Sequence, residues 1–145
     1  LLLVTFVNHE IDSIAEEMDM VALEDMAPIR QTGYDRRKHA KEIELISAKY
    51  NKPILFTELG YKSIKGTSKK PWEWNGIKNI YSKISKKEQL LSYQAFFNNI
   101  WKESWFHGVH IWEWQSHGVS NGNNANFTIE GKPSLNLIAK YFKIH

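Results

Sequence analysis

The chain has 145 residues, of which 42% are hydrophobic and 24% charged, a balance typical of one globular domain with a sizeable core. It contains no cysteine, which excludes disulfides and thiolate chemistry but leaves the cellular compartment open. Its net charge of +3 comes without a massed basic face, which disfavours a nucleic-acid partner, and no apolar run approaches the roughly 20 residues of a membrane-spanning helix.

Short apolar runs alternate with helical patterns along the first half of the chain. Leu1–Val7 is typical of a strand buried on both faces of a parallel sheet. It starts at residue 1 without a methionine or a turn, so we expect a strand inside a larger structure; an N-terminal edge strand is the alternative. Met20–Leu23 predicts a second buried strand. A helix is predicted over Tyr34–Tyr50, and Pro53 stops it because proline disfavours helix in the preceding residue.

The same alternation continues in the second half. Ile54–Thr57 predicts a third strand. The next helix is marked by Ser85 and Glu88 at the spacing of a capping box, in which each side chain accepts a hydrogen bond from the other's backbone N–H. Gly108–Trp114 predicts a fourth strand, and Pro133 opens a last helix.

Strands that alternate with helices, with no hairpin signal between them, predict an α/β fold with a parallel sheet of four βα units. The spacing fits either a small open doubly wound sheet or half of a closed barrel. The polar residues favour the barrel, because they gather at the carboxyl ends of the strands, where such barrels place their chemistry. An open sheet also binds ligands at that end. These polar residues are Asn8, His9, Glu24, Asp25, Glu58, Glu113 and Gln115.

Glu58 is the strongest candidate for chemistry, because a carboxylate at a strand end can serve as nucleophile or as acid/base in glycoside hydrolysis. A structural carboxylate bonded to a loop is the alternative. Trp112 and Trp114, two residues apart on the fourth predicted strand, would face one side and offer flat apolar surfaces to a sugar. Alternatively, Trp112 is core and only Trp114 reaches ligand. Trp72 and Trp74, in a long loop, are typical of a binding rim.

Other chemistries lack support in the sequence. The six histidines show no metal-ligand spacing, and His107 and His110 are expected to be buried and hydrogen-bonded in or beside the fourth strand. No glycine-rich phosphate loop and no Gly-x-Ser-x-Gly elbow occurs. We therefore expect neither a metal nor a cofactor.

Taken together, several of these motifs resemble a known family of enzymes. The likeness is to the C-terminal half of glycoside hydrolase family 113, (β/α)8 barrels that are mostly endo-β-1,4-mannanases and retain anomeric configuration. It extends loosely over nearly all of the chain, from Phe6 to Pro133. The residues that carry it best are Lys52–Ser63, Gly66, Pro71, Trp72, Trp74, Gln89, Tyr93, Ala95, Trp105, Phe106, Gly108, Trp112 and Trp114.

The resemblance implies that residues 1–145 are part of one catalytic barrel, its strands five to eight, with no second domain. Glu58 then matches the nucleophile, and the acid/base glutamate at the end of strand four would lie upstream of Leu1. The implied substrate is a β-1,4-linked polysaccharide, above all β-mannan, hydrolysed by double displacement. The expected substrate-binding residues are Trp114, Trp112, Trp72, Trp74, Tyr61 and Asn8.

Two other functions remain open at this point. The family commonly has an aromatic residue near position 26, where this chain has Met26, which favours a barrel relative that binds glycans without cleaving them. The other alternative is an unrelated small α/β domain. If the chain is half a barrel, we expect it to be inactive alone and to self-associate through its open sheet edges.

Overall fold

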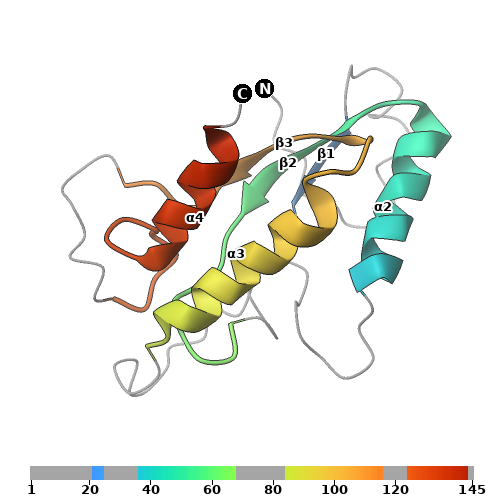
Figure 1. Ribbon diagram of the computed structural model, residues 1–145. Coiled ribbons are helices and arrows are strands. Elements are labelled where there is room, and N and C mark those ends of the chain that lie inside the picture. The colour runs from blue at the N-terminus through green and yellow to red at the C-terminus, as the bar shows by residue number, and fades with distance from the viewer. Residues whose placement is uncertain (1–20, 25–35, 68–83, 116–123, 144–145) are drawn as a thin grey trace.

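The computed structural model describes residues 21–24, 36–67, 84–115 and 124–143 (Figure 1). Three parallel strands form one sheet in the order β1 (Val21–Glu24), β2 (Ile54–Leu59) and β3 (Phe106–Ile111). Each strand is followed by a helix: α2 (Arg36–Tyr50), α3 (Lys86–Ile100) and α4 (Pro133–Phe142). The predicted α/β class, with parallel strands and helical connections, is therefore correct. The first predicted strand, Leu1–Val7, lies outside the described residues.

Local sequence explains where α2 ends. Asn51 follows the helix with φ of 52°, in the left-handed region that asparagine tolerates and that often terminates helices. Its backbone N–H donates to the carbonyl of Ala48, and the Ser47 hydroxyl donates to the carbonyl of Lys52 at 2.6 Å. Pro53 then leads into β2, as the sequence predicts.

The helix α3 starts with only half of the predicted capping box. Ser85 Oγ accepts a hydrogen bond from the Glu88 N–H at 3.3 Å, as expected. The Glu88 carboxylate, however, accepts from the N–H of Gly66, and the Ser85 N–H donates to the carbonyl of Ser63 at 2.8 Å. The second predicted bond of the capping box, from the Ser85 N–H to the Glu88 carboxylate, is therefore wrong. The loop before the helix supplies other partners for both groups, Ser63 for the Ser85 N–H and Gly66 for the carboxylate.

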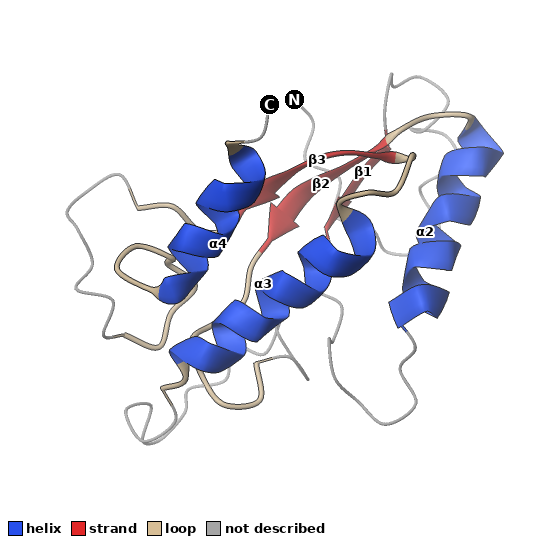
Figure 2. Ribbon diagram, viewed as in Figure 1, coloured by secondary structure: helices blue, strands red, loops and turns tan. Residues whose placement is uncertain are grey.

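Aromatic side chains fill the space between the sheet and the helices. Phe56, fully buried on β2, packs edge-on against Phe96 of α3 with ring centroids 5.3 Å apart. Phe97 of α3 stacks on Tyr141 of α4 at 4.2 Å. In Figure 2, α3 runs between α2 and α4, and it contacts both. The Phe56 side of the sheet is thus the side that the helices cover.

The strand β2 carries a bulge that changes which way its last residues face. Phe56 and Glu58 pair with consecutive residues of β1, so Thr57 is an extra residue. Along the other edge of β2, Phe56 pairs with Val109 and Leu59 pairs with Ile111. The β2 residues are three positions apart and their β3 partners only two, so β2 has one extra residue relative to β3 as well. Paired residues share a face, and consecutive residues alternate between faces. Glu58 therefore faces away from Phe56 and the helices, whereas the buried Leu59 faces toward them.

The fourth predicted strand is displaced toward the N-terminus. Instead of Gly108–Trp114 it spans Phe106–Ile111. The N–H of Trp112 still donates to the carbonyl of Leu59 at 2.8 Å, but the residues beyond it leave the sheet. His107 and His110 are exposed, so their expected burial is wrong: on β3, only Val109 is fully buried against the helix side.

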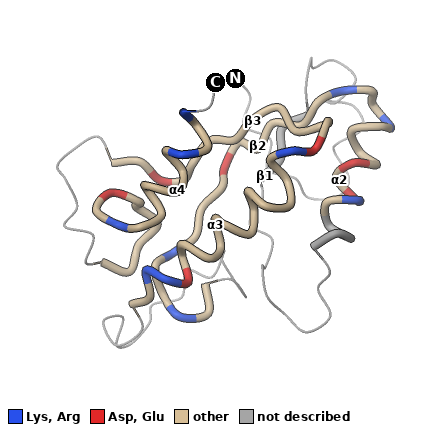
Figure 3. The backbone as a smooth tube through the Cα atoms, viewed as in Figure 1, with Lys and Arg blue, Asp and Glu red and all other residues tan. Residues whose placement is uncertain are grey.

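Two other features of the described residues concern membrane-spanning helices and the distribution of charge. None of the helices in the described ranges is long and apolar enough to cross a bilayer. Basic and acidic residues are interspersed along the described backbone (Figure 3).

Candidate active site at the carboxyl ends of the strands

Glu58 lies next to last on β2, at the carboxyl end of the sheet. The bulge turns it to the face opposite the helices, and its side chain is half-buried. A carboxylate in this position is partly shielded from water and lies at the end of the sheet where parallel α/β folds place their ligands. This is the setting that nucleophilic and acid/base carboxylates need.

The chain that follows β3 brings two tryptophans to the same end of the sheet. We call residues Trp112–Gln115 the Trp segment. Trp112 is 39% exposed and Trp114 is 62% exposed, so neither is core. Both lie beyond Ile111, the last residue of β3, so the expectation that they lie on a regular strand is wrong. Their nearness to Glu58 comes instead from the bond between Trp112 and Leu59.

A close backbone approach holds the start of the Trp segment. A Cβ atom at Gly60 would lie 2.6 Å from the carbonyl oxygen of Trp112, closer than real Cβ atoms come, so only glycine fits there. The hydroxyl of Tyr93 donates to the same carbonyl at 3.5 Å. Burial raises the pKa of Tyr93 far above its usual range, so the hydroxyl keeps its proton.

Two charged side chains are buried beneath the end of the Trp segment. Glu130, 8% exposed, accepts a hydrogen bond from the backbone N–H of Gln115 at 2.9 Å through Oε1. Lys132, 3% exposed, donates to the carbonyl of Asn126 at 3.1 Å and to Thr128 Oγ1 at 3.4 Å.

The electrostatics of Lys132 reflect this burial. The pKa of Lys132 is lowered from 10.5 to about 8, mainly by burial and to a smaller extent by the charge of Lys86. The charges of Glu130 and Glu113 oppose this shift. The two carboxylates thus offset part of the lowering that burial causes.

Gln89 of α3 connects the two loops that flank the site. Its Nε2 donates to the carbonyls of Tyr61 at 2.8 Å and Phe127 at 3.2 Å, and its Oε1 accepts from Ser134 of α4. The ring of Tyr61 is 1% exposed and packs edge-on against Tyr93 at 5.1 Å. Tyr61 is thus a core residue, and we leave it out of the candidate binding surface.

Three of the predicted site residues lie at or beyond the carboxyl ends of β2 and β3: Glu58, Trp112 and Trp114. Asn8, Trp72 and Trp74 lie outside the described residues. Sequence reasoning gave no role to three supporting side chains, Gln89, Glu130 and Lys132, although Gln89 is among the residues that carry the family likeness. The sequence around Glu130 and Lys132 does contain a pattern that could have drawn attention to them. Polar residues occupy every second position from 124 to 132 and alternate with the buried Ala125, Phe127 and Ile129.

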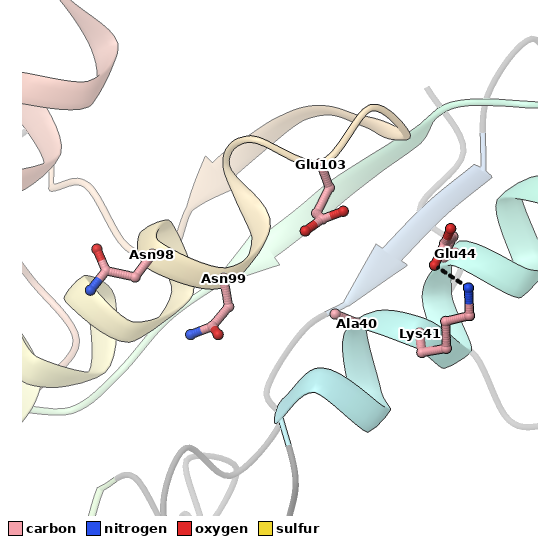
Figure 4. A pocket seen from close by; sticks show the side chains of 6 residues that line it. All are labelled: Ala40, Lys41, Glu44, Asn98, Asn99 and Glu103. Carbon is pink, nitrogen blue, oxygen red and sulfur yellow. Dashed lines mark hydrogen bonds and ion pairs between the residues drawn. The ribbon is translucent and has the colours of Figure 1, made fainter.

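No group of three His, Asp or Glu side chains in the described parts of the chain could hold a metal ion. An open hollow of about 310 Å³ lies between α2 and α3 (Figure 4). Its lining includes the ion pair Lys41–Glu44, 2.8 Å long, and Glu103, which precedes β3. This places the hollow toward the amino end of β3, away from Glu58, so we do not assign it to the site. Its lining residues are Ala40, Lys41, Glu44, Asn98, Asn99 and Glu103.

Comparison with known proteins decides the family. The sequence model of Glycoside Hydrolase Family 113 matches residues 7–132. The chain belongs to glycoside hydrolase family 113. The resemblance seen in the sequence is thereby confirmed, and the alternative of an unrelated α/β domain is excluded. A search among curated proteins finds no match.

Solved structures of the same family share the fold. A GH113 β-1,4-mannanase in a complex has a TM-score of 0.79 at 24% identity, over 95% of this chain and 44% of its own. AaManA, the GH113 β-mannanase of Alicyclobacillus acidocaldarius in complex with ManMIm, has a TM-score of 0.74 at 24% identity, over 90% and 42%. Another GH113 β-1,4-mannanase has a TM-score of 0.76 at 26% identity, over 88% and 40%. The chain thus spans less than half the length of these enzymes.

Replacing Gly60 with alanine tests the close approach to Trp112. The added Cβ would meet backbone, so we expect a loss of about 1 to 3 kcal/mol in the free energy of unfolding, measured by urea denaturation. Gly108→Ala is the matched control, because its Cβ would meet only the movable Leu55 Cδ1 at 3.2 Å. Equal costs for the two variants would contradict the close approach.

The lowered pKa of Lys132 predicts a pH dependence of stability. Between pH 8 and 10.5 the unfolded chain binds more protons at this residue than the folded one, so stability should rise with pH in this window. We expect Lys132→Met to lack this rise, and the stability difference between wild type and variant to change from pH 7 to pH 10. The exposed Lys140→Met controls for the loss of one positive charge. The same pH-dependent difference in both variants would contradict the prediction.

Proposed function

We propose that this protein is a retaining glycoside hydrolase that cleaves a β-1,4-linked polysaccharide, above all β-mannan, with Glu58 as nucleophile. The observation that carries the proposal is the position of Glu58: at the carboxyl end of β2, turned away from the helices by the bulge, beside an exposed pair of tryptophans. Membership of glycoside hydrolase family 113 supports the reaction class, and three solved relatives named as mannanases support the substrate.

The reaction requires two carboxyl groups. In retaining hydrolysis, an acid protonates the glycosidic oxygen while a nucleophile about 5 Å from it attacks the anomeric carbon and forms a covalent glycosyl intermediate. Water, deprotonated by the first group, then releases the sugar with its configuration retained. Glu58 takes the nucleophile's part. We propose that the acid/base glutamate comes from the end of barrel strand four, upstream of Leu1, so that these 145 residues alone are inactive.

The barrel itself is part of the proposal. We assign Leu1–Val7 to strand five of a (β/α)8 barrel, β1 to strand six, β2 to strand seven and β3 to strand eight, within one catalytic domain. The parallel order β1-β2-β3 with a helix after each strand supports this assignment. So does the extent of the likeness, which covers 40 to 44% of each mannanase.

Trp114 and Trp112 suit a sugar subsite. Their exposed indoles offer rigid apolar faces that match the C–H face of a pyranose ring. Trp72, Trp74 and Asn8 remain proposed substrate-binding residues from the sequence. No metal or cofactor has a part in this mechanism.

Removal of the Glu58 carboxylate should abolish hydrolysis. In the full-length protein we expect Glu58→Ala to lose at least about 10³-fold in kcat on mannan, since no group remains to form the covalent intermediate. Azide should restore release of the aryl group from an activated aryl β-glycoside, because the small anion can occupy the vacated position and attack the anomeric carbon. The product would be a glycosyl azide of inverted configuration.

Glu103→Gln is the matched control, an exposed carboxylate that precedes β3, and should keep normal activity. Near-normal hydrolysis by Glu58→Ala would overturn the proposal. Glycan binding without turnover in the wild type would support the alternative of a non-catalytic relative.

The 145-residue chain alone should associate or melt at low temperature. Within the described sheet β1 and β3 are the edge strands, and open strand edges invite pairing with another chain. Size-exclusion chromatography with thermal melting measures both properties. A monomer that unfolds cooperatively at high temperature would contradict the half-barrel assignment.

A further inference from the structure

The Trp segment needs an anchor beyond packing. Trp114 is 62% exposed, so packing covers only a minor part of its side chain. The described backbone bonds hold the segment at its two ends. Trp112 N–H donates to the carbonyl of Leu59 at 2.8 Å, and Gln115 N–H donates to Glu130 Oε1 at 2.9 Å. The first bond continues the sheet, whereas the second depends on one side chain.

Glu130 is itself held in place by its surroundings. It lies in a turn in which Lys132 N–H donates to the carbonyl of Ile129 at 3.1 Å, and Gly131 adopts φ of 68°. The preceding Ile129 is 1% exposed and Lys132, two residues after Glu130, is 3% exposed; α4 then begins at Pro133. The carboxylate is therefore presented from a packed turn at the start of a helix.

The hydrogen bond from the Gln115 N–H to Glu130 Oε1 is of a kind that can hold the Trp segment in place. A hydrogen bond from a backbone N–H to an ionised carboxylate is about twice as strong as one between neutral groups, and more so where water is excluded. The second oxygen, Oε2, is buried and has no hydrogen-bond partner within the described ranges. A buried acceptor without a partner costs stability. The carboxylate has two effects within the described residues: its charge favours the buried Lys132 ammonium, and Oε1 holds the Gln115 N–H.

We propose that Glu130 is a positioning residue that fixes the Trp segment, and with it Trp114, beside Glu58 at the end of the sheet. It acts through the Gln115 N–H and does not touch the substrate. The role in glycan binding rests on the proposed function, but the hold on the segment does not. Two measurements therefore test the inference separately.

The first measurement is amide hydrogen exchange at single-residue resolution in the full-length protein. In Glu130→Ala we expect Gln115 to exchange at least about tenfold faster, because its acceptor is gone. Glu130→Gln keeps an acceptor oxygen and should stay within about threefold of wild type. The amide of Ile54, bonded to the carbonyl of Trp105 at 2.8 Å, reports global stability and should not change.

The second measurement is a double-mutant cycle on mannan. Glu130→Ala and Trp114→Ala should each raise KM about fivefold or more, with kcat within about threefold of wild type. If Glu130 acts through Trp114, the double variant should be no worse than Trp114→Ala alone. Glu130→Gln should restore most of the affinity, which a loss of general stability would not explain.

Each outcome decides the inference. Unchanged exchange at Gln115, additive effects in the cycle, or faster exchange with no change in KM would overturn it. If the wild type neither binds nor cleaves any glycan, the proposed function fails, and the exchange at Gln115 still decides whether Glu130 holds the segment.

Discussion

The extra residue in β2 is the constraint on which the candidate site depends. The strand must supply Phe56 and Leu59 to the helix side, where both are fully buried, and also present Glu58 on the other side. A regular strand cannot do this, because residues two apart share a face. Thr57 resolves the conflict by shifting the register against both neighbouring strands at once. Bulges next to active sites commonly re-aim a side chain in this way.

Behind the strand ends, polar side chains take over from the aromatic core. Gln89, fully buried on α3, bonds the carbonyls that follow β2 and those that precede α4, and so joins two loops that are far apart in the sequence. Buried amides and charges of this kind are costly unless they are bonded, and they then define one arrangement of the backbone around them. Glu130 and Lys132 are likewise buried and hydrogen-bonded, and Glu130 bonds the end of the Trp segment. The aromatic core thus stabilises the helices against the sheet, and the polar layer determines the shape of the loops above it.

Sequence patterns anticipated what depends on local rules and missed what depends on distant partners. Apolar runs placed β1 and β2 within a residue or two, and Ser85 and Pro133 marked the starts of α3 and α4. The end of β3 was missed because residues 112–114 look like a strand, yet their backbone is set by Gly60 and Leu59, some fifty residues earlier. The capping box is incomplete for the same reason, since the Glu88 carboxylate accepts a hydrogen bond from the distant Gly66 N–H instead of from Ser85. His110 is exposed because it lies on the face of β3 that the described helices do not cover, which an apolar pattern cannot reveal.

That uncovered face bears on what the chain must pack against. Leu55 and Glu58 are half-buried and His110 is exposed on the side of the sheet opposite the helices, and the described elements leave that side open. Parallel sheets are stable when both faces are covered. In a closed barrel the inner face is covered by the strands across the axis, which would also bring the second carboxylate opposite Glu58. In the barrel that we propose, the same closure that covers this face would also complete the catalytic pair, so folding and activity would depend on the same contacts.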